Sequence, residues 1–118
     1  MAEPAFTCRI AFTPDGGAAV VSLAGTMGPE AVQELHPRVQ DAYRAGARRF
    51  IFDLSALQHT GSVGLRLLLG LRTQVKGEGR VVICSPSGPV LTILNTMKLE
   101  EVLPVYATRE EALEAARI

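Results

Sequence analysis

The chain has 118 residues, 47% of them hydrophobic and 20% charged, so it is long enough to bury one core, and we expect a single domain over residues 1–118. Twelve basic residues balance twelve acidic ones, which excludes a strong overall attraction to nucleic acid or to an anionic membrane. No apolar run approaches the roughly 18 residues that cross a bilayer. The first residues, MAEPAF, include an acidic residue and no basic one, whereas a secretion signal begins with basic residues. We therefore expect a cytoplasmic protein that does not insert into membranes.

The two cysteines, Cys8 and Cys84, lie in separate apolar runs. They form no CxxC pair and no cluster with histidine, so the pattern indicates buried, reduced thiols. We expect neither a metal nor a cofactor.

The first elements form a hairpin. From Phe6 to Thr13 apolar and polar residues alternate, which is typical of a half-buried strand. The turn PDGG, Pro14 to Gly17, then leads into a second strand, AAVVSLAG.

A helix follows, with Pro29 in its first turn and Gly46 as its stop. Its apolar positions recur at helical spacing, at Val32, Leu35, Val39 and Tyr43. Pro37 lacks an amide hydrogen and clashes with the preceding turn, so we expect a kink or break between about Gln33 and His36.

Strands and helices then alternate. RRFIFDL predicts a buried strand that ends near Asp53 and Leu54, and a helix follows from about Ser62 to Lys76. Arg80 to Cys84 predicts another buried strand, and Ser87 or Pro89 begins a third helix. That helix carries Val90, Leu91, Leu94 and Met97.

The chain closes with a short strand, VLPVY, and an amphipathic helix whose Thr108 and Glu111 have the spacing of a capping box. Parallel strands need helical crossovers, so this order of elements predicts an α/β fold. We expect a mixed sheet of four to five strands, with an N-terminal hairpin and about four helices. In open α/β sheets, sites lie beyond the carboxyl ends of strands, which is where Ser62 falls.

Three interpretations of Ser62 differ in what they require. The first interpretation is a catalytic nucleophile in a G-x-S-x-G elbow. The stretch TGSVG has Thr60 in place of the first glycine of that motif, and neither His36 nor His59 has an identifiable carboxylate to orient it. The phosphate-loop spacing G-x-x-x-x-G-K-[ST] is absent. A second interpretation is that Ser62 or Thr60 caps the helix. A third is that a phosphoryl group on Ser62 faces the positive end of the helix dipole, which is compatible with capping.

The helix after Ser62 is apolar over more than one stripe. One of its faces nevertheless groups Ser62, Arg66, Leu69, Gly70 and Thr73. If this face points outward, it forms a smooth, partly apolar surface beside the serine that suits a protein partner. The alternative is that Leu69 belongs to the core.

The stretch FIFDLSALQHTGSVGLRLLLGL resembles the central motif of STAS domains, in particular of bacterial anti-sigma factor antagonists. The usual pattern is a hydrophobic strand, D-L-S, then D-S-S-G-L and a leucine-rich helix. The similarity extends through LAG in the second strand and through VVICSPSGPVLTILNTMKLEEVLPVYATREEAL. The resemblance implies a STAS-like fold without catalysis. It also implies binding to a kinase-like anti-sigma factor, which phosphorylation of the motif serine would end.

Matched residue by residue, the phosphorylated serine of the family corresponds to Ser62 and the strand-end aspartate to Asp53. The motif glycine and leucine correspond to Gly64 and Leu65. Three positions depart from the pattern: Gly61 and Val63 replace the aspartate and the second serine of D-S-S-G-L, and Gly28 replaces the aspartate of a G-E-L-D pattern. Both acidic positions near the phosphoacceptor are therefore missing.

The resemblance implies a partner-switching pathway in which the partner is an anti-sigma factor with serine kinase activity, and it admits a serine phosphatase as a further partner. The expected partner-binding residues are Gly28, His59, Thr60, Gly61, Ser62, Arg66, Leu69, Gly70 and Thr73, in the helix face and in loops around Gly25–Gly28 and His59–Gly61. The chief rival is a STAS subunit that supports the ATPase of a membrane transporter. An enzyme is the third alternative.

Overall fold

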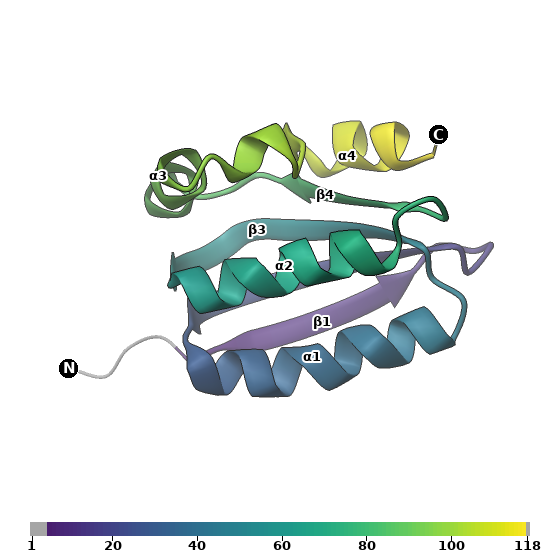
Figure 1. Cartoon of the computed structure of the whole chain (residues 1–118), viewed down its shortest axis with the longest axis horizontal. Helices are drawn as coiled ribbons and strands as arrows, with labels where there is room; N and C mark the ends of the chain where they lie inside the picture. Colours follow the sequence, from purple (N-terminus) through teal and green to yellow (C-terminus); the bar gives the residue numbers. More distant parts are fainter. Residues whose placement is uncertain (1–4, 118) are drawn as a thin grey trace.

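The computed structural model describes residues 5–117, and within them the chain builds a mixed five-stranded sheet of order β1-β2-β3-β4-β5 (Figure 1). β1 (Thr7–Phe12) is antiparallel to β2 (Ala18–Met27), whereas β3 (Arg49–Thr60), β4 (Arg80–Cys84) and β5 (Val105–Tyr106) continue the sheet in parallel. The helices are α1 (Pro29–Arg44), α2 (Ser62–Gln74), α3 (Gly88–Thr96) and α4 (Arg109–Ala116), with a short 3₁₀ helix, η1 (Leu99–Glu101). The predicted α/β fold is confirmed. Residues 1–4, on which the expected lack of an export signal rests in part, lie outside the described residues.

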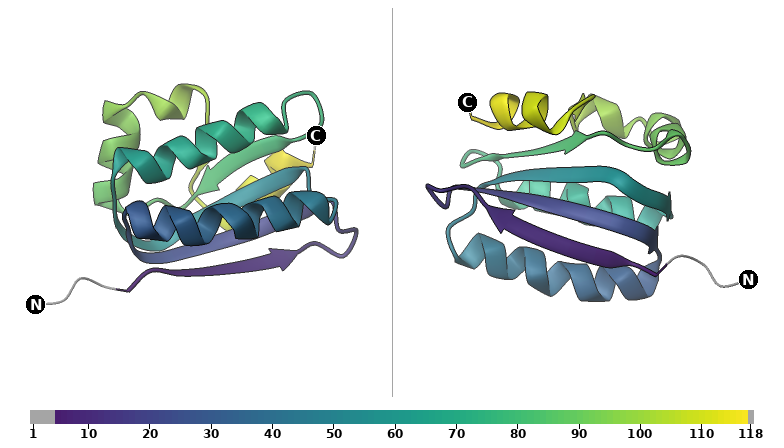
Figure 2. Two further views of the ribbon diagram at one scale, coloured as in Figure 1. Left: turned by 60° about the horizontal axis from the view of Figure 1, so that its bottom comes forward. Right: turned by 180° about the vertical axis from the view of Figure 1, so that it is seen from behind.

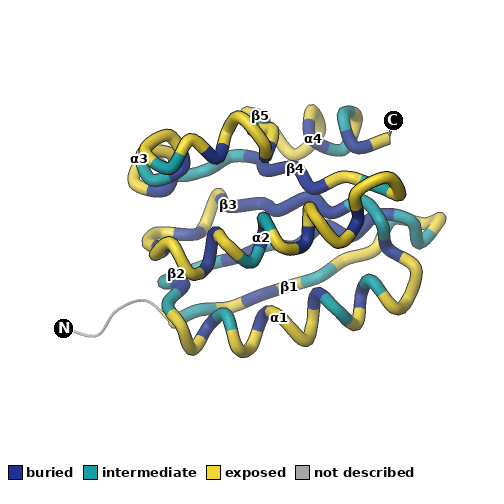
Figure 3. The backbone as a smooth tube through the Cα atoms, in the orientation of Figure 1, coloured by how far each residue is buried: buried dark blue, intermediate teal, exposed yellow. Residues whose placement is uncertain are grey.

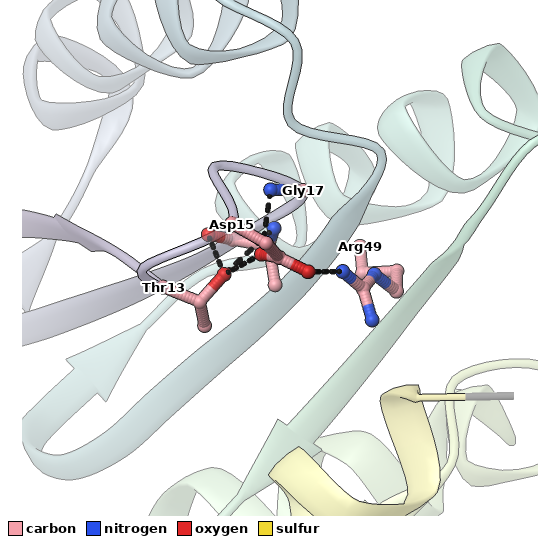
Figure 4. A network of polar contacts seen from close by, with 5 residues as sticks. Thr13, Asp15, Gly17 and Arg49 are labelled. Carbon is pink, nitrogen blue, oxygen red and sulfur yellow. Dashed lines mark hydrogen bonds and ion pairs between the residues drawn. The ribbon is translucent and has the colours of Figure 1, made fainter.

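The turn of the predicted hairpin is held by one carboxylate, that of Asp15 (Figure 4). Its Oδ1 accepts hydrogen bonds from the Thr13 hydroxyl at 2.6 Å and the Gly17 amide at 2.9 Å. Its Oδ2 accepts one from Arg49 at 3.1 Å. The Thr13 hydroxyl, the Gly17 amide and Arg49 together lower the pKa of Asp15 to about 2, because each stabilises the ionised carboxylate. The network connects the β1–β2 turn to the start of β3.

β3 is longer than predicted: it continues past Asp53 and Leu54 to Thr60. The second half of β2 pairs with this extension, so that Thr26 lies beside His59 and Met27 beside Thr60. Two register shifts interrupt the pairing, the second of them between Gly25, whose φ is +86°, and Thr26. Such irregularities destroy the alternation of buried and exposed side chains, and the sequence pattern therefore does not reveal the extension.

The helices cover the two faces of the sheet unequally. α1 and α2 lie side by side on one face, and their apolar sides build the main core with β1, β2 and β3 (Figures 1 and 2). On the other face α4 packs on β3, β4 and β5 and touches one side of β2, which leaves the outer side of β1 uncovered by a helix (Figure 2, right). The most deeply buried backbone therefore runs through β3 and β4 (Figure 3).

The first long helix does not break where the sequence predicted a kink or break, between about Gln33 and His36. α1 is continuous across Pro37, which is exposed, while Leu35 and Val39 on either side are buried against the sheet. The apolar contacts of these neighbours hold the helix in place where the proline removes one backbone hydrogen bond.

Both cysteines are buried free thiols, as predicted. Cys8 packs in the main core, and Cys84 lies on the opposite face beneath α4. Burial raises the pKa of both thiols, that of Cys84 to about 11, because the thiolate would lose its hydration.

α4 is fixed to the sheet by an ion pair. Thr108 caps the helix by accepting a hydrogen bond from the Glu111 amide at 3.1 Å, which confirms the predicted N-terminus. The next residue, Arg109, donates to Asp53 Oδ2 from Nη2 at 2.6 Å and from Nε at 3.1 Å, and also reaches the Ser22 hydroxyl at 3.0 Å. An arginine is unfavourable at the positive end of a helix dipole, so the carboxylate of β3 explains its presence there.

Asp53 is itself nearly buried, with 8% of its surface exposed. Burial opposes its ionisation, but the hydrogen bonds from the Ser55 backbone and from Arg109 outweigh this effect and hold the pKa of Asp53 below its usual value. The carboxylate is therefore ionised at neutral pH and depends on Arg109 for compensation of its charge.

The start of α2 approaches the end of β2 so closely that Gly64 has no room for a side chain. A Cβ at this position would lie 2.6 Å from Met27 Cε and 2.9 Å from Thr60 Oγ1. Gly70, six residues further along α2, has open space at the position of a Cβ. The motif glycine of the sequence is thus a packing requirement.

We predict that Arg109→Ala lowers the free energy of unfolding by about 2 kcal/mol, because it leaves a buried carboxylate without its charged partner. Arg117→Ala, which removes an exposed ion pair from the end of the same helix, should cost less than about 0.5 kcal/mol. Chemical denaturation of both variants measures the difference. Equal losses would show that the Asp53 pair does not fix α4.

The same pair predicts a dependence on pH. The folded-state pKa of Asp53 lies below its value of about 3.9 in an unfolded chain. Its contribution to stability is therefore complete above that value and is lost as the pH falls through the folded-state pKa. Arg109→Ala should flatten this acid-side loss, whereas Arg117→Ala should leave it unchanged.

We predict opposite effects for the same substitution at two glycines of α2. Gly64→Ala should destabilise the fold by about 1–3 kcal/mol, because Met27 and Thr60 must move. Gly70→Ala should stabilise it by about 0.5–1 kcal/mol, because alanine favours a helix and nothing obstructs its methyl group. Thermal melts compare the two. A stabilised Gly64→Ala protein would contradict the close packing.

Candidate functional site

The carboxyl ends of β2 and β3 meet at one edge of the sheet, and each leads directly into a helix. Met27 pairs with Thr60, and the Gly61 amide donates to the Met27 carbonyl oxygen at 3.4 Å. The next residues, Gly28 and Gly61, are the N-caps of α1 and α2. Parallel pairing thus places two helix N-termini side by side at the left of Figure 1.

Ser62 is exposed and occupies the first position of α2. The N-cap is Gly61, and it makes no side-chain capping bond, so the prediction that Ser62 or Thr60 caps this helix is wrong. Thr60 is buried, and its hydroxyl donates instead to the Gly61 carbonyl oxygen at 3.1 Å. The reason is the length of β3, which keeps Thr60 in the strand and leaves one residue for the turn.

The electrostatic environment of Ser62 favours an anion. The first amides of a helix have no partner within the helix, and no side chain caps those of α2. The first turn of α2 contains no acidic residue, and that of α1 contains one, Glu30. The dipoles of both helices direct their positive ends to this edge. A negative group on the Ser62 hydroxyl would lie beside them.

The exposed face of α2 agrees with the predicted docking face in most positions. Arg66, Gly70 and Thr73 are exposed, and the Thr73 hydroxyl donates to the Leu69 carbonyl oxygen at 3.2 Å. Leu69 is half-buried and packs against the main core. Both interpretations of Leu69 are therefore partly right: it belongs to the edge of the core and still contributes to the surface.

The loops that were expected to flank this face are largely strand. Gly25 lies in β2 and His59 in β3, where His59 is exposed, so the turns shrink to Gly28 and Gly61. The structure brings Gly28, His59, Thr60, Gly61 and Ser62 to one edge, and the remaining predicted residues follow along α2. Register between distant strands decides this grouping.

Two residues of this surface were missed as partner-binding candidates. Val63 has 47% of its surface exposed directly beside Ser62. It lines a groove of about 360 Å³ between α1 and α2, to which α1 contributes His36 and the predicted face contributes Arg66 and Gly70. The departure from the family pattern at Val63 was the available signal. The place of His36 depends on how α1 packs on α2.

Ser62 makes no hydrogen bond to either histidine, or to any other side chain, in the part of the chain that the structure describes. Across residues 5–117 no three metal-ligating side chains gather in one place. None of the helices formed there is long and apolar enough to cross a bilayer.

Comparison with known proteins identifies the family. Residues 9–112 match the STAS domain. BtrV of Bordetella bronchiseptica, which bears the name of an anti-sigma factor antagonist, is 26% identical over 100 residues, covering 84% of this chain and 86% of that protein. The crystal structure of an anti-sigma factor antagonist from Mycobacterium paratuberculosis has 24% identity and a TM-score of 0.86, covering 97% of this chain and 96% of that one.

The anti-sigma factor antagonist SpoIIAA has the same fold in two forms. Its unphosphorylated form has 23% identity and a TM-score of 0.79, covering 96% of each chain. The phosphorylated form from Bacillus has 22% identity and a TM-score of 0.70, covering 94% of this chain and 98% of that one. The match over residues 9–112 and the shared fold confirm the resemblance seen in the sequence: the chain belongs to the STAS domain family.

Proposed function

We propose that this STAS domain acts as an anti-sigma factor antagonist, a cytoplasmic binding module without catalysis of its own. It binds a kinase-like anti-sigma factor through the Ser62 edge and the exposed face of α2, and competes there with the sigma factor. The observation that carries the proposal is the position of Ser62, exposed at the start of α2 and continuous with an open face of that helix. The names of BtrV and of the structural neighbours of this chain support the same role.

Phosphorylation of Ser62 is the proposed control. A phosphoryl group carries about −1.5 to −2 charges at neutral pH. The uncapped amides of α2 accommodate this charge. Positions 28 and 61 are glycines, so no carboxylate at either position repels it. The fold therefore tolerates the phosphoryl group, while its bulk and charge interfere with a partner on the same surface. That SpoIIAA occurs in phosphorylated form supports this control.

Both glycines that replace family acids, Gly28 and Gly61, are N-cap residues. Asp or Asn at an N-cap accepts an amide hydrogen bond, whereas glycine leaves the amide open at a cost of only a few tenths of a kcal/mol. A Cβ at Gly28 or Gly61 would meet nothing within 4 Å, so side chains fit at both positions. The contribution of the family acids to phosphoryl transfer has no counterpart at these two positions, and the groove residues His36 and Val63 offer partner contacts beside them.

We predict that Gly70→Arg weakens binding to the anti-sigma factor at least about tenfold without loss of stability. The position is open to solvent and on the proposed face, so the new side chain obstructs the partner and not the fold. Ala107→Arg is the control, since it adds the same charge at an exposed position just before α4. Calorimetric titration with thermal melts measures both. Unchanged binding by the Gly70→Arg protein would show that the middle of α2 is not part of the binding surface.

We predict that the partner kinase and ATP add one phosphate to Ser62 and that Ser62→Ala prevents it. Ser62→Asp should weaken partner binding at least about tenfold through its charge, whereas the similar-sized but neutral Ser62→Asn should not. Peptide mass analysis and binding titrations are the measurements. A protein that stays unlabelled while the same kinase labels another antagonist would exclude the switch and leave binding intact. Binding to a transporter ATPase, with none to an anti-sigma factor, would favour the rival STAS role.

A further inference from the structure

The end of α2 opposite Ser62 borders a second surface feature, a shallow hollow of about 220 Å³. Three of its lining residues are basic: Arg72 near the end of α2, Lys76 in the turn that follows, and Arg80 at the start of β4. All three are exposed. We refer to this feature, defined by these three side chains, as the basic hollow. The turn from α2 to β4, which contributes to this lining, lies at the right of Figure 1.

The charges of the basic hollow are not neutralised by the described part of the chain. Neither an ion pair nor a side-chain hydrogen bond is formed by Arg72, Lys76 or Arg80 within residues 5–117. Nearby arginines behave differently. Arg49 pairs with Asp15 at 3.1 Å (Figure 4), and Arg48 pairs with Glu78 at 3.2 Å.

The nearest carboxylate in sequence is turned away from the hollow. Glu78 lies between Lys76 and Arg80, but its Oε2 forms an ion pair with Arg48 Nε at 3.2 Å and accepts a hydrogen bond from the Tyr43 hydroxyl at 3.1 Å. Those partners belong to α1 and to the residues before β3. No acidic residue lines the hollow itself. The lining of the hollow is therefore positively charged although the whole chain carries formal net charge +0.

The remaining lining is apolar or backbone. Val102, one of the few large apolar side chains of the described chain that are clearly exposed, is 37% exposed and lies beside Pro104. Gly77, with φ +86°, also lines the hollow, and its amide makes no hydrogen bond to another backbone group. The surface thus combines three cations and a small apolar patch. This combination suits a chain segment with carboxylates and an apolar side chain.

We propose that the basic hollow binds an acidic peptide segment of a partner protein, with carboxylates on Arg72, Lys76 and Arg80 and an apolar side chain on Val102. The helix dipole does not account for the grouping, because Arg80 comes from the neighbouring strand. A nucleic acid is the less suitable polyanion. The hollow offers no aromatic side chain for base stacking, and three cations on a neutral chain give few phosphate contacts.

The basic hollow is separate from the Ser62 edge. Arg72 follows Ser62 by ten residues, which correspond to about 15 Å along α2. A partner can therefore engage both surfaces at once, or two partners can bind together. The inference goes beyond the proposed antagonist function and does not depend on it.

The test uses the full chain and a short fluorescein-labelled peptide of glutamate, aspartate and leucine, titrated by fluorescence anisotropy at low and at physiological ionic strength. We expect measurable binding that weakens with salt. Binding should also weaken at least about tenfold in the triple variant Arg72→Gln, Lys76→Gln, Arg80→Gln, because three partly exposed charge pairs are lost. A peptide with glutamine and asparagine in place of the acids should not bind.

The matched control removes three exposed arginines elsewhere, as Arg9→Gln, Arg44→Gln, Arg117→Gln, with the same change in net charge. Thermal melts establish that both triple variants fold. Retained binding by the control and lost binding by the basic-hollow variant support the proposal. Equal losses of peptide binding in the two variants would show that only net charge matters, and this result would overturn the proposal. Tighter binding of an oligothymidylate of equal charge, lost in the basic-hollow variant, would also overturn it in favour of a nucleic acid.

Amide chemical shifts locate the peptide independently of affinity. Addition of the acidic peptide should shift the amides of Gly77, Gly79 and Val102 and leave those of Gly61 and Ser62 unchanged. Shifts confined to the Ser62 edge would overturn the proposal and assign peptide binding to the surface of the proposed antagonist function. A failure of antagonist activity, by contrast, would leave these shifts unaffected.

Discussion

The parallel pairing of β2 with β3 is the constraint on which the rest of the structure depends. It extends past Asp53 to Thr60, through two register shifts, and places the ends of both strands at one edge. α1 and α2 begin there, so they run side by side across the same face of the sheet and bury one core. A helix must start where its strand ends, so the strand register also determines where Ser62 stands and which way its helix dipole points.

Packing and function meet at the glycines of this edge. Gly64 is required because Met27 and Thr60 leave no space for a Cβ, whereas Gly28 and Gly61 have open space around them. Their absence of side chains is therefore not imposed by the fold. It leaves the N-termini of two helices without a capping carboxylate beside an exposed serine. In the same motif, Gly64 is therefore required for packing, and Gly61, three residues earlier, leaves the helix N-terminus without a negative charge.

Charges divide the molecule into parts with different roles. Asp15 and Asp53 each hold two elements together through an arginine. Both carboxyl groups have lowered pKa values because hydrogen bonds stabilise the ionised form, from Thr13, Gly17 and Arg49 at Asp15 and from the Ser55 backbone and Arg109 at Asp53. The basic residues of the basic hollow have no such partner within the described chain. Paired charges here fix the hairpin and α4, while unpaired ones remain available at the surface.

The sequence by itself determined the α/β class, the order of its strands and helices, and the family, because hydrophobic periodicity and the DLS and GL pieces are local properties. It also identified most of the exposed face of α2. Only the tertiary structure decided the length of β3, the continuity of α1 across Pro37, the N-cap at Gly61 and the half-buried place of Leu69. Each of these depends on contacts between segments far apart in the chain. Strand register, close helix packing and the pairing of Glu78 with Arg48 leave no periodic trace in the residues that take part.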